Sequence, residues 1–274
     1  MYSTSSDTGK ILITGGTSGL GLELVKFFLH KGYEVVATGR KLQSDLDYKN
    51  RFTFCITDFS NLRQTSDEVK RICRDHKFDV VINNAGVLSP PDFRLTDDGY
   101  EYTFQVNFLS HLLLDEIIIR NTDRWKPLKI ATTVSPVYRI AGTDLVLNKS
   151  EADYRPFRAY SNSKLYLALM CSYLPGKHQR VDLKCVGFDP GVFSSGIYRM
   201  QKGWFRFLYK VAAPFMRSPE KIAVRYAGLV ERKDLVNGAV YKSDIQKGSM
   251  PVTDNPVSDG FWKECYKIIE PYLI

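Results

Sequence analysis

The sequence predicts an α/β fold: a doubly wound parallel sheet of about seven strands flanked by helices. Three observations predict it. Short apolar runs rich in β-branched residues alternate with helical patterns, a glycine-rich turn joins the first run to the first helix, and no linker or repeat interrupts this order. The length of 274 residues is acceptable for one such domain, and 44% hydrophobic residues suffice for its core. We therefore expect residues 1–274 to form a single domain.

The first predicted strand is directly followed by a turn and a helix. The Ile-Leu-Ile run at residues 11–13 is typical of a buried parallel strand. After a turn at residues 14–21, Leu24, Phe27 and Phe28 continue at helical spacing. The turn therefore lies at a strand–helix junction, where the N-terminus of the helix can bind an anion.

The turn at residues 14–21 is predicted to bind a dinucleotide. Gly15 permits the tight turn, Gly19 lets the backbone approach a pyrophosphate, and Gly21 allows close packing of the helix on the strand. A merely structural turn is the alternative. The cofactor contacts expected here are Gly15, Thr17, Ser18, Gly19, Leu20 and Gly21.

The residues that follow the second predicted strand, 34–38, indicate which dinucleotide binds. An acid at this strand end would bind the adenine ribose of NAD. Arg40 and Lys41 stand there instead, and a cation suits the additional 2′-phosphate of NADP. Two solvated surface charges are the alternative. The sequence thus favours NADP (NADPH) as the cofactor.

The third predicted strand, residues 51–57, ends beside an acid. Asp58 is expected to accept a hydrogen bond from the adenine amino group or to cap the helix that begins near Asn61. Phe59 is included among the expected cofactor contacts.

The fourth predicted strand, residues 78–82, runs into the motif Asn83-Asn-Ala-Gly86. With the glycine turn and the later motifs, this sequence resembles the short-chain dehydrogenase/reductase superfamily, and it looks most like the retinol-dehydrogenase-like branch. The resemblance covers essentially the whole chain. The later motifs, in order along the chain, are Asn107, Ser135, Tyr160-x-x-x-Lys164 and Pro190-Gly191.

The resemblance implies a Rossmann domain that transfers a hydride between a nicotinamide and a carbonyl or alcohol. The Pro-Gly element would form a lip over the nicotinamide. Beyond the glycine turn, the implied cofactor contacts are Asn84, Ala85, Gly86, Tyr160, Lys164, Pro190, Gly191 and Val192.

Tyr160 and Lys164 are predicted to lie one turn apart on a helix, so the phenol and the ammonium can be near each other. A phenol has a reference pKa of about 10, and an adjacent ammonium lowers it. Tyr160 is therefore predicted to act as general acid in carbonyl reduction and as general base in alcohol oxidation. The resemblance implies that Lys164 also holds the nicotinamide ribose. A surface Tyr–Lys pair is the alternative.

Two further positions complete the implied catalytic set. Ser135 would hydrogen-bond the substrate oxygen, although Val134 replaces a serine often found in the family and Pro136 restricts Ser135 to an extended backbone. Asn107 lies in an apolar helix, which it would distort to hold a water of the proton relay. A helix cap or a hydrogen-bonded core amide is the alternative for Asn107.

The sixth predicted strand, residues 181–188, precedes Asp189, where the branch usually has His. Residues 192–217 combine aromatic residues with interspersed cations. They are predicted to form a lid over a hydrophobic substrate, with core packing or a membrane interface as alternatives. The chain then continues with a predicted helix, a last strand and a terminal helix, at residues 218–231, 237–241 and 261–272.

Composition limits the remaining function classes. Five scattered cysteines without a metal spacing predict reduced thiols in an intracellular protein. The N-terminus lacks a signal-peptide pattern, and no run of about 18 apolar residues could span a membrane. The basic residues behind the net charge of +8 follow no nucleic-acid motif. His111 is expected to be a core or interface residue, and the other histidines predict no metal site.

Together these observations predict an NADP(H)-dependent alcohol dehydrogenase or carbonyl reductase for a hydrophobic small molecule. The alternative is a catalytically weak NADP(H)-binding sensor or scaffold, for which only Pro136 and Asp189 argue. A cytoplasmic protein is expected, with no nucleic-acid partner and no transmembrane segment. Peripheral membrane contact and a homo-oligomer stay open.

Overall fold

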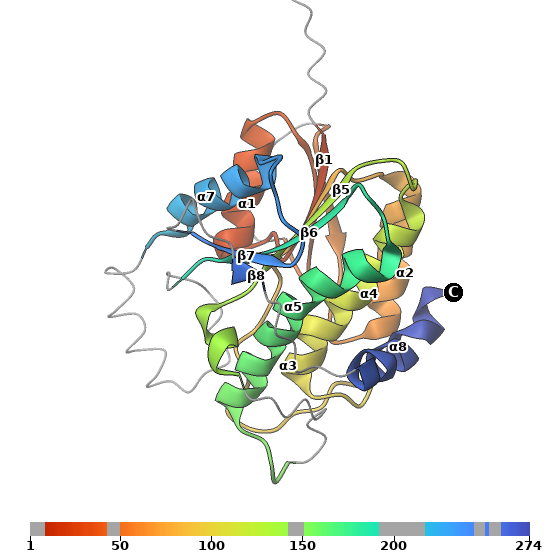
Figure 1. The fold of residues 1–274 in the computed structure, drawn as a ribbon, viewed down its shortest axis with the longest axis vertical. Coiled ribbons are helices and arrows are strands. Elements are labelled where there is room, and N and C mark those ends of the chain that lie inside the picture. Colours follow the sequence, from red (N-terminus) through yellow and green to blue (C-terminus); the bar gives the residue numbers. More distant parts are fainter. Residues whose placement is uncertain (1–8, 43–49, 142–150, 192–216, 244–249, 252–258) are drawn as a thin grey trace, which may run out of the picture.

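A mainly parallel sheet forms the centre of the molecule. The computed structural model describes residues 9–42, 50–141, 151–191, 217–243, 250–251 and 259–274 (Figure 1). Within them the sheet has eight strands in the order β3-β2-β1-β4-β5-β6-β7-β8. The strands are β1 (Lys10–Thr14), β2 (Glu34–Gly39), β3 (Phe52–Ile56), β4 (Val80–Asn83), β5 (Leu128–Thr133), β6 (Leu183–Asp189), β7 (Ala239–Lys242) and β8 (Met250–Pro251).

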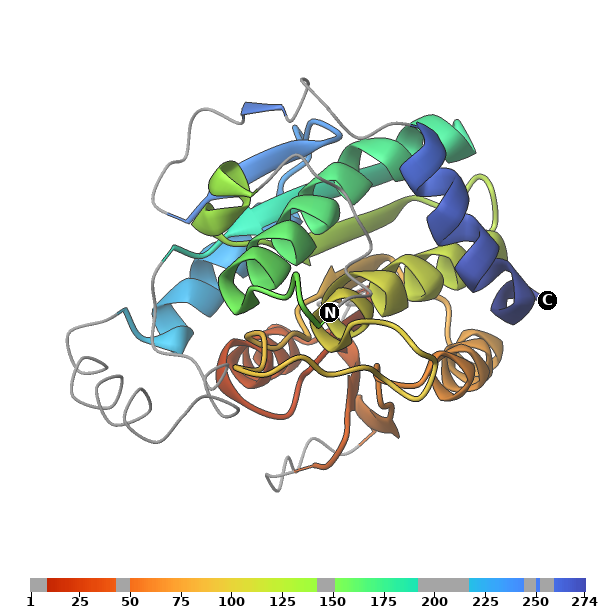
Figure 2. The same ribbon diagram turned by 90° about the horizontal axis from the view of Figure 1, so that it is seen from below.

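Helices cover both faces of this sheet (Figure 2). On one face α1 packs beside α7, and on the other lie α2, α4 and α5. The helices are α1 (Gly19–His30), α2 (Leu62–Asp75), α3 (Tyr102–Phe104), α4 (Ser110–Asn121), α5 (Pro156–His178), α7 (Pro219–Glu231) and α8 (Asp259–Leu273). A π-helical segment, η1 (Gln105–Leu109), separates α3 from α4, and a 3-10 turn, η2 (Pro136–Ile140), follows β5.

The core lies between the sheet and each helix layer. Ile11 and Ile13 of β1 pack in the same cluster as Tyr226 of α7, whereas Leu12 packs in the cluster that contains Phe108 of η1. All five side chains are fully buried. This alternation is the period of two that a strand imposes, and both faces of the strand are apolar because helices cover both.

The predicted doubly wound sheet is confirmed, with β1 to β7 parallel to one another. Its order reverses between β1 and β4, and the carboxyl ends of the strands at such a switch point flank the crevice where these folds bind ligands. The sequence pattern missed β8, a two-residue strand antiparallel to β7. The last predicted strand begins at Ala239 rather than at Asn237, because Gly238 has a left-handed backbone and the Asn237 side chain is hydrogen-bonded to Leu183 and Cys185 at the start of β6.

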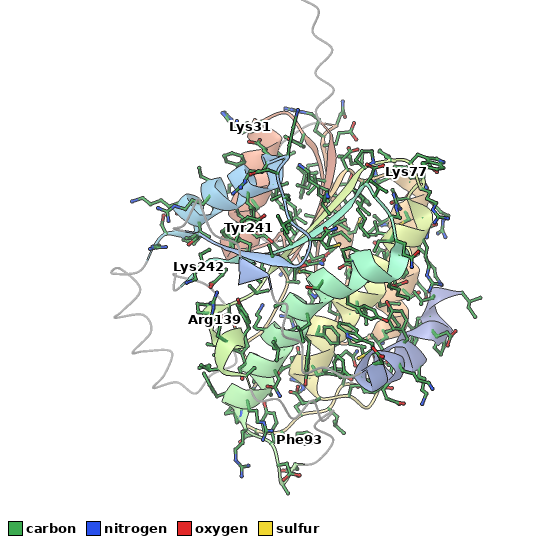
Figure 3. All side chains as sticks on the ribbon, viewed as in Figure 1. Lys31, Lys77, Phe93, Arg139, Tyr241 and Lys242 are labelled. Atoms are coloured by element: carbon green, nitrogen blue, oxygen red, sulfur yellow. The ribbon has the colours of Figure 1, made fainter. Side chains whose placement is uncertain are left out.

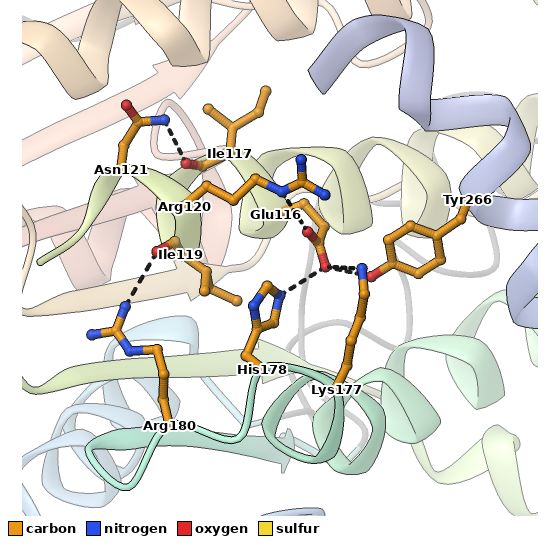
Figure 4. A network of polar contacts seen from close by, with 9 residues as sticks. All are labelled: Glu116, Ile117, Ile119, Arg120, Asn121, Lys177, His178, Arg180 and Tyr266. Atoms are coloured by element: carbon orange, nitrogen blue, oxygen red, sulfur yellow. Dashed lines mark hydrogen bonds and ion pairs between the residues drawn. The ribbon is translucent and has the colours of Figure 1, made fainter. Parts of the chain in front are cut away.

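Besides its apolar contacts with the core, the C-terminal helix α8 is hydrogen-bonded to a buried carboxylate (Figure 4). Glu116 of α4 accepts hydrogen bonds from Lys177 Nζ at 3.1 Å, from His178 Nε2 at 2.9 Å and from the Tyr266 hydroxyl of α8. Burial raises the pKa of Glu116, but the hydrogen bonds from His178 and Tyr266 outweigh burial and lower it to about 2. The ionised carboxylate therefore links α4, α5 and α8.

Among the described helices, none combines the length and the apolar composition needed to cross a membrane.

Candidate functional site

The glycine turn forms a bare backbone cradle between β1 and α1. Gly15 and Gly19 have φ values of +66° and +53°, in the left-handed region that favours glycine. A Cβ at Gly21 would lie 2.2 Å from the Gly15 carbonyl oxygen and 2.5 Å from Asn84 Nδ2. Side chains are therefore excluded from this junction. The resulting surface of backbone N–H groups at a helix N-terminus fits a dinucleotide pyrophosphate.

Thr14 connects the cradle to the motif that follows β4. Its hydroxyl oxygen accepts hydrogen bonds from the backbone N–H groups of Asn84 and Ala85, each at 2.9 Å. Asn84 Nδ2 returns a bond to the Thr14 carbonyl oxygen at 3.1 Å. The structure thus brings Gly15, Asn84 and Ala85 together. Thr14 was not among the contacts expected from the sequence, although it is the first residue of the glycine turn.

His111 connects Thr14, at the end of β1, to the π-helical segment η1 by hydrogen bonds. Its Nδ1 lies 2.8 Å from the Asn107 carbonyl oxygen, which can only accept, so Nδ1 carries the proton. Its Nε2 lies 3.1 Å from the Thr14 hydroxyl. Because that hydroxyl oxygen already accepts two N–H groups, it donates its proton to Nε2. Burial lowers the pKa of His111 to about 3, so the ring is neutral. His111 is a hydrogen-bonded core residue.

Asn107 lies at the centre of the π-helical segment η1 and is fully buried. Its Oδ1 accepts a hydrogen bond from the Val87 N–H at 2.8 Å, and its Nδ2 donates to the Val87 carbonyl at 2.9 Å and to Ser163 Oγ at 3.0 Å. Asn107 is therefore not a helix cap. Its amide joins the helix before α4 to the loop after β4 and to α5.

Lys164 is buried at the same place. Its Nζ donates to the Thr133 carbonyl at the end of β5, at 2.9 Å, and lies 5.9 Å from the centre of the Tyr160 ring. A Cβ at Gly86 would lie 3.3 Å from Asn107 Oδ1 and 3.8 Å from Lys164 Nζ, so these groups converge on one point. Burial lowers the pKa of Lys164 to about 8, which leaves it mostly protonated at pH 7.

Ser135 lies two residues after the end of β5, with Val134 between them. Its backbone is extended, with φ −157° and ψ 150°, as the proline at position 136 requires. Val134 is buried and its N–H donates to the Phe188 carbonyl at 2.9 Å, continuing the pairing of β5 with β6. Ser135 is partly exposed at the same sheet edge as Lys164 and Gly86.

At the far end of this edge, Arg40 and Lys41 are exposed directly after β2. Asp58 does not cap α2: its Oδ1 accepts from the backbone N–H and the hydroxyl of Ser60 at 2.9 and 2.8 Å, whereas Asn61 caps the helix by accepting from the Gln64 N–H at 2.8 Å. The capping alternative for Asp58 is therefore wrong, because the cap position lies three residues later, directly before the first helical residue Leu62.

Phe59, an expected cofactor contact, turns its side chain into the core. Its ring is buried edge-on against His111, with ring centres 4.9 Å apart. Its carbonyl oxygen accepts the Ser110 hydroxyl at 2.7 Å. Any contact of Phe59 with a cofactor would therefore come from its backbone N–H.

Pro190 and Gly191 follow β6, and Gly191 has a φ of +70°. Val192 lies outside the described residues, as does the remainder of the predicted lid up to residue 216.

Among the described residues no group of three or more His, Cys, Asp or Glu could hold a metal ion. All five cysteines are free and buried.

Comparison with known proteins identifies similar chains. The family model described as short chain dehydrogenase matches residues 9–203. Polyprenol dehydrogenase of Homo sapiens is 26% identical over 269 residues, which cover 89% of this chain and 79% of that protein. Retinol dehydrogenase 12 of Mus musculus is 26% identical over 251 residues, covering 86% and 78%. A short chain dehydrogenase structure from Shigella flexneri 2a, complexed with NADP, has a TM-score of 0.65 at 17% identity, covering 87% and 98%, and shows the likeness of fold.

Proposed function

This chain belongs to the short-chain dehydrogenase family of oxidoreductases, and from that premise we propose that it transfers a hydride between NADP(H) and a carbonyl or alcohol of a hydrophobic small molecule. One observation carries the proposal: Lys164, Asn107 and Gly86 converge beside the glycine cradle, at the strand edge where Ser135 is partly exposed. The relatives named above supply the substrate class, because polyprenol and retinol are alcohols with long apolar chains.

In the proposed reaction the nicotinamide supplies or accepts the hydride. Tyr160 gives its phenolic proton to the carbonyl oxygen during reduction and takes it back during oxidation. Lys164 stays cationic at neutral pH and favours the phenolate by its charge. Ser135 holds the substrate oxygen within reach of the Tyr160 hydroxyl, so that the reacting groups are already oriented for proton transfer.

The cofactor would lie along the carboxyl edge of the sheet. Gly15 to Gly21 would hold the pyrophosphate, Asn84 to Gly86 and Lys164 the nicotinamide ribose side, and Arg40 with Lys41 the 2′-phosphate. Asp58 would accept a hydrogen bond from the adenine amino group. These assignments follow the family resemblance together with the bare backbone of the cradle.

Pro136 and Asp189, the only residues that argued for a sensor or scaffold, each have a structural role here. Pro136 opens the 3-10 turn after Ser135, and Asp189 forms an ion pair. A cytoplasmic location, peripheral membrane contact and self-association stay predictions from the sequence.

Changing Arg40 to Asp should weaken NADPH binding and improve NADH binding. A charge-assisted contact with the 2′-phosphate contributes roughly 1.5–3 kcal/mol, and an acid at this strand end can instead bind the ribose hydroxyl of NAD. Titration calorimetry with both cofactors measures the shift. Wild-type protein that binds NADH as tightly as NADPH would contradict the assignment.

The function itself is tested by incubating the purified protein with NADPH and aldehydes and ketones of graded size and polarity. We expect oxidation of NADPH, fastest with bulky apolar carbonyls. The absence of turnover with every carbonyl, and with the matching alcohols and NADP, would refute the proposal.

We further propose that residues 192–217 cover the substrate. Replacing Trp204 and Phe205 by Ser should then raise the KM of bulky apolar carbonyls more than that of small polar ones. The melting temperature should change little, because a lid contributes less to the core than the sheet does. An unfolded double variant would instead assign both side chains to the core, and an equal slowing of all substrates would remove the segment from substrate choice.

A further inference from the structure

The carboxylate of Asp189 contacts two parts of the chain at once. Asp189 ends β6, and its side chain is only 3% exposed. Its Oδ1 accepts the Gly191 N–H at 3.0 Å, and its Oδ2 lies 3.2 Å from Arg139 Nη1. Arg139 belongs to η2, the turn that directly follows Ser135. The ion pair therefore joins the segment after β5 to the segment after β6.

The same segment is also held from its other side. Ser243, which follows β7, donates its N–H to the Asp189 carbonyl at 2.9 Å and its hydroxyl to the Pro190 carbonyl at 3.0 Å. Arg217 donates to the Ser243 hydroxyl oxygen at 3.1 Å. The backbone of residues 189–191 is thus held by Ser243, which follows β7. The Asp189 side chain is held by Arg139 of η2. Lys242 of β7 is the register partner of Asp189, and Figure 3 labels both Lys242 and Arg139.

A pair of this kind is poorly explained by stability alone. Burying a carboxylate costs free energy that one attraction to a partly exposed guanidinium barely offsets, and such pairs contribute little net stability. What the contact does determine is geometry. It sets the position of Gly191, whose backbone N–H it binds, relative to Ser135, four residues before Arg139 in the chain.

We propose that Arg139 and Asp189 are positioning residues, whose ion pair fixes the Pro190–Gly191 turn against the Ser135 segment so that the nicotinamide end of the cofactor is held beside the substrate oxygen. This inference rests on the proposed function and on the family resemblance, which implies that the Pro190–Gly191 turn forms a lip over the nicotinamide. The adenine end of the cofactor, at Arg40 and Lys41, is not touched by this contact.

The test compares Asp189→Asn, Arg139→Met and the double variant. Asn at position 189 keeps an oxygen for the Gly191 N–H and removes only the charge. We expect each single variant to weaken NADPH binding about tenfold, the effect of losing one charge-assisted bond. The double variant should be no weaker than either single one, because the two residues act through one contact. Arg139→Lys should recover part of the affinity.

Adenosine 2′,5′-bisphosphate, which lacks the nicotinamide, provides the decisive readout. Its affinity should stay unchanged in all variants while that of NADPH falls. Asp234→Asn, which breaks the exposed Arg232–Asp234 pair of 2.6 Å, is the matched control and should alter neither affinity. Equal loss of both ligands, additive losses in the double variant, or unchanged NADPH binding would overturn the inference. Failure of wild-type protein to bind any nicotinamide dinucleotide would instead refute the proposed function.

Discussion

Replacing Tyr160 with Phe should lower turnover by about 10²–10⁴-fold while NADPH still binds, because the ring stays and only the proton-transferring hydroxyl is lost. The expected size is large since no other described residue is assigned to this proton. Lys164, whose Nζ lies 5.9 Å from the ring centre, remains in place to hold the cofactor. Single-turnover oxidation of NADPH and a separate binding titration measure the two quantities.

Tyr173→Phe is the matched control. It makes the same change on the same helix, but Tyr173 stacks on Trp262 of α8, with ring centres 3.9 Å apart, and lies outside the site. Its turnover should equal that of wild type. Retained activity in Tyr160→Phe would remove Tyr160 from the mechanism, and lost NADPH binding would show that the substitution disturbed the structure.

Replacing Lys164 with Met should produce two large effects, a fall in turnover of about 10²-fold or more and a changed dependence of stability on pH. Burial lowers the pKa of Lys164 from 10.5 to about 8 in the folded protein. Below pH 8 both the folded and the unfolded states carry the proton, so the buried charge lowers the free energy of unfolding by its full amount. Between pH 8 and 10.5 the unfolded state binds more protons, and stability therefore rises with pH.

The Met variant lacks this titration. The free energy of unfolding of wild type, minus that of the variant, should therefore rise between pH 7.5 and 10.5, on the order of 3 kcal/mol in total. Urea unfolding of both proteins across this range measures it, and other alkaline groups cancel in the difference. Lys129→Met, which removes a partly buried lysine bonded to the Val230 and Arg232 carbonyls at 2.8 Å, should leave turnover unchanged. A flat difference for Lys164→Met would mean that Lys164 keeps an ordinary pKa.

The glycine turn, the order of strands and helices and the backbone of Ser135 could be predicted from the sequence, because each depends on neighbouring residues. The glycines at positions 15, 19 and 21 are needed because the backbone there is left-handed or too close to the next segment for a Cβ. The alternation of β-branched runs with helical patterns is confirmed in the parallel sheet. The extended conformation of Ser135 follows from its neighbour at 136 alone.

Other features needed the folded chain. The sequence left Asp58 with two roles, and the structure assigns the helix cap to Asn61. The sequence showed Asp189 only as a departure from the related branch. Its partner, Arg139, lies 50 positions earlier in the chain and could not be inferred. His111 was expected in the core, but its bond to Thr14, 97 positions away, could not be inferred.

The sequence by itself thus determined the order of elements, the cradle and the chemical types at the site, because helical period, strand alternation and the steric demands of glycine and proline act over a few residues. The tertiary structure alone decided which side chains meet. Arg139 reaches Asp189 because β5 and β6 are hydrogen-bonded neighbours, and His111 reaches Thr14 because η1 and α4 pack beneath β1 and β4. Such pairings depend on strand order and helix packing, which arise from the burial of the whole apolar surface and which no short segment encodes.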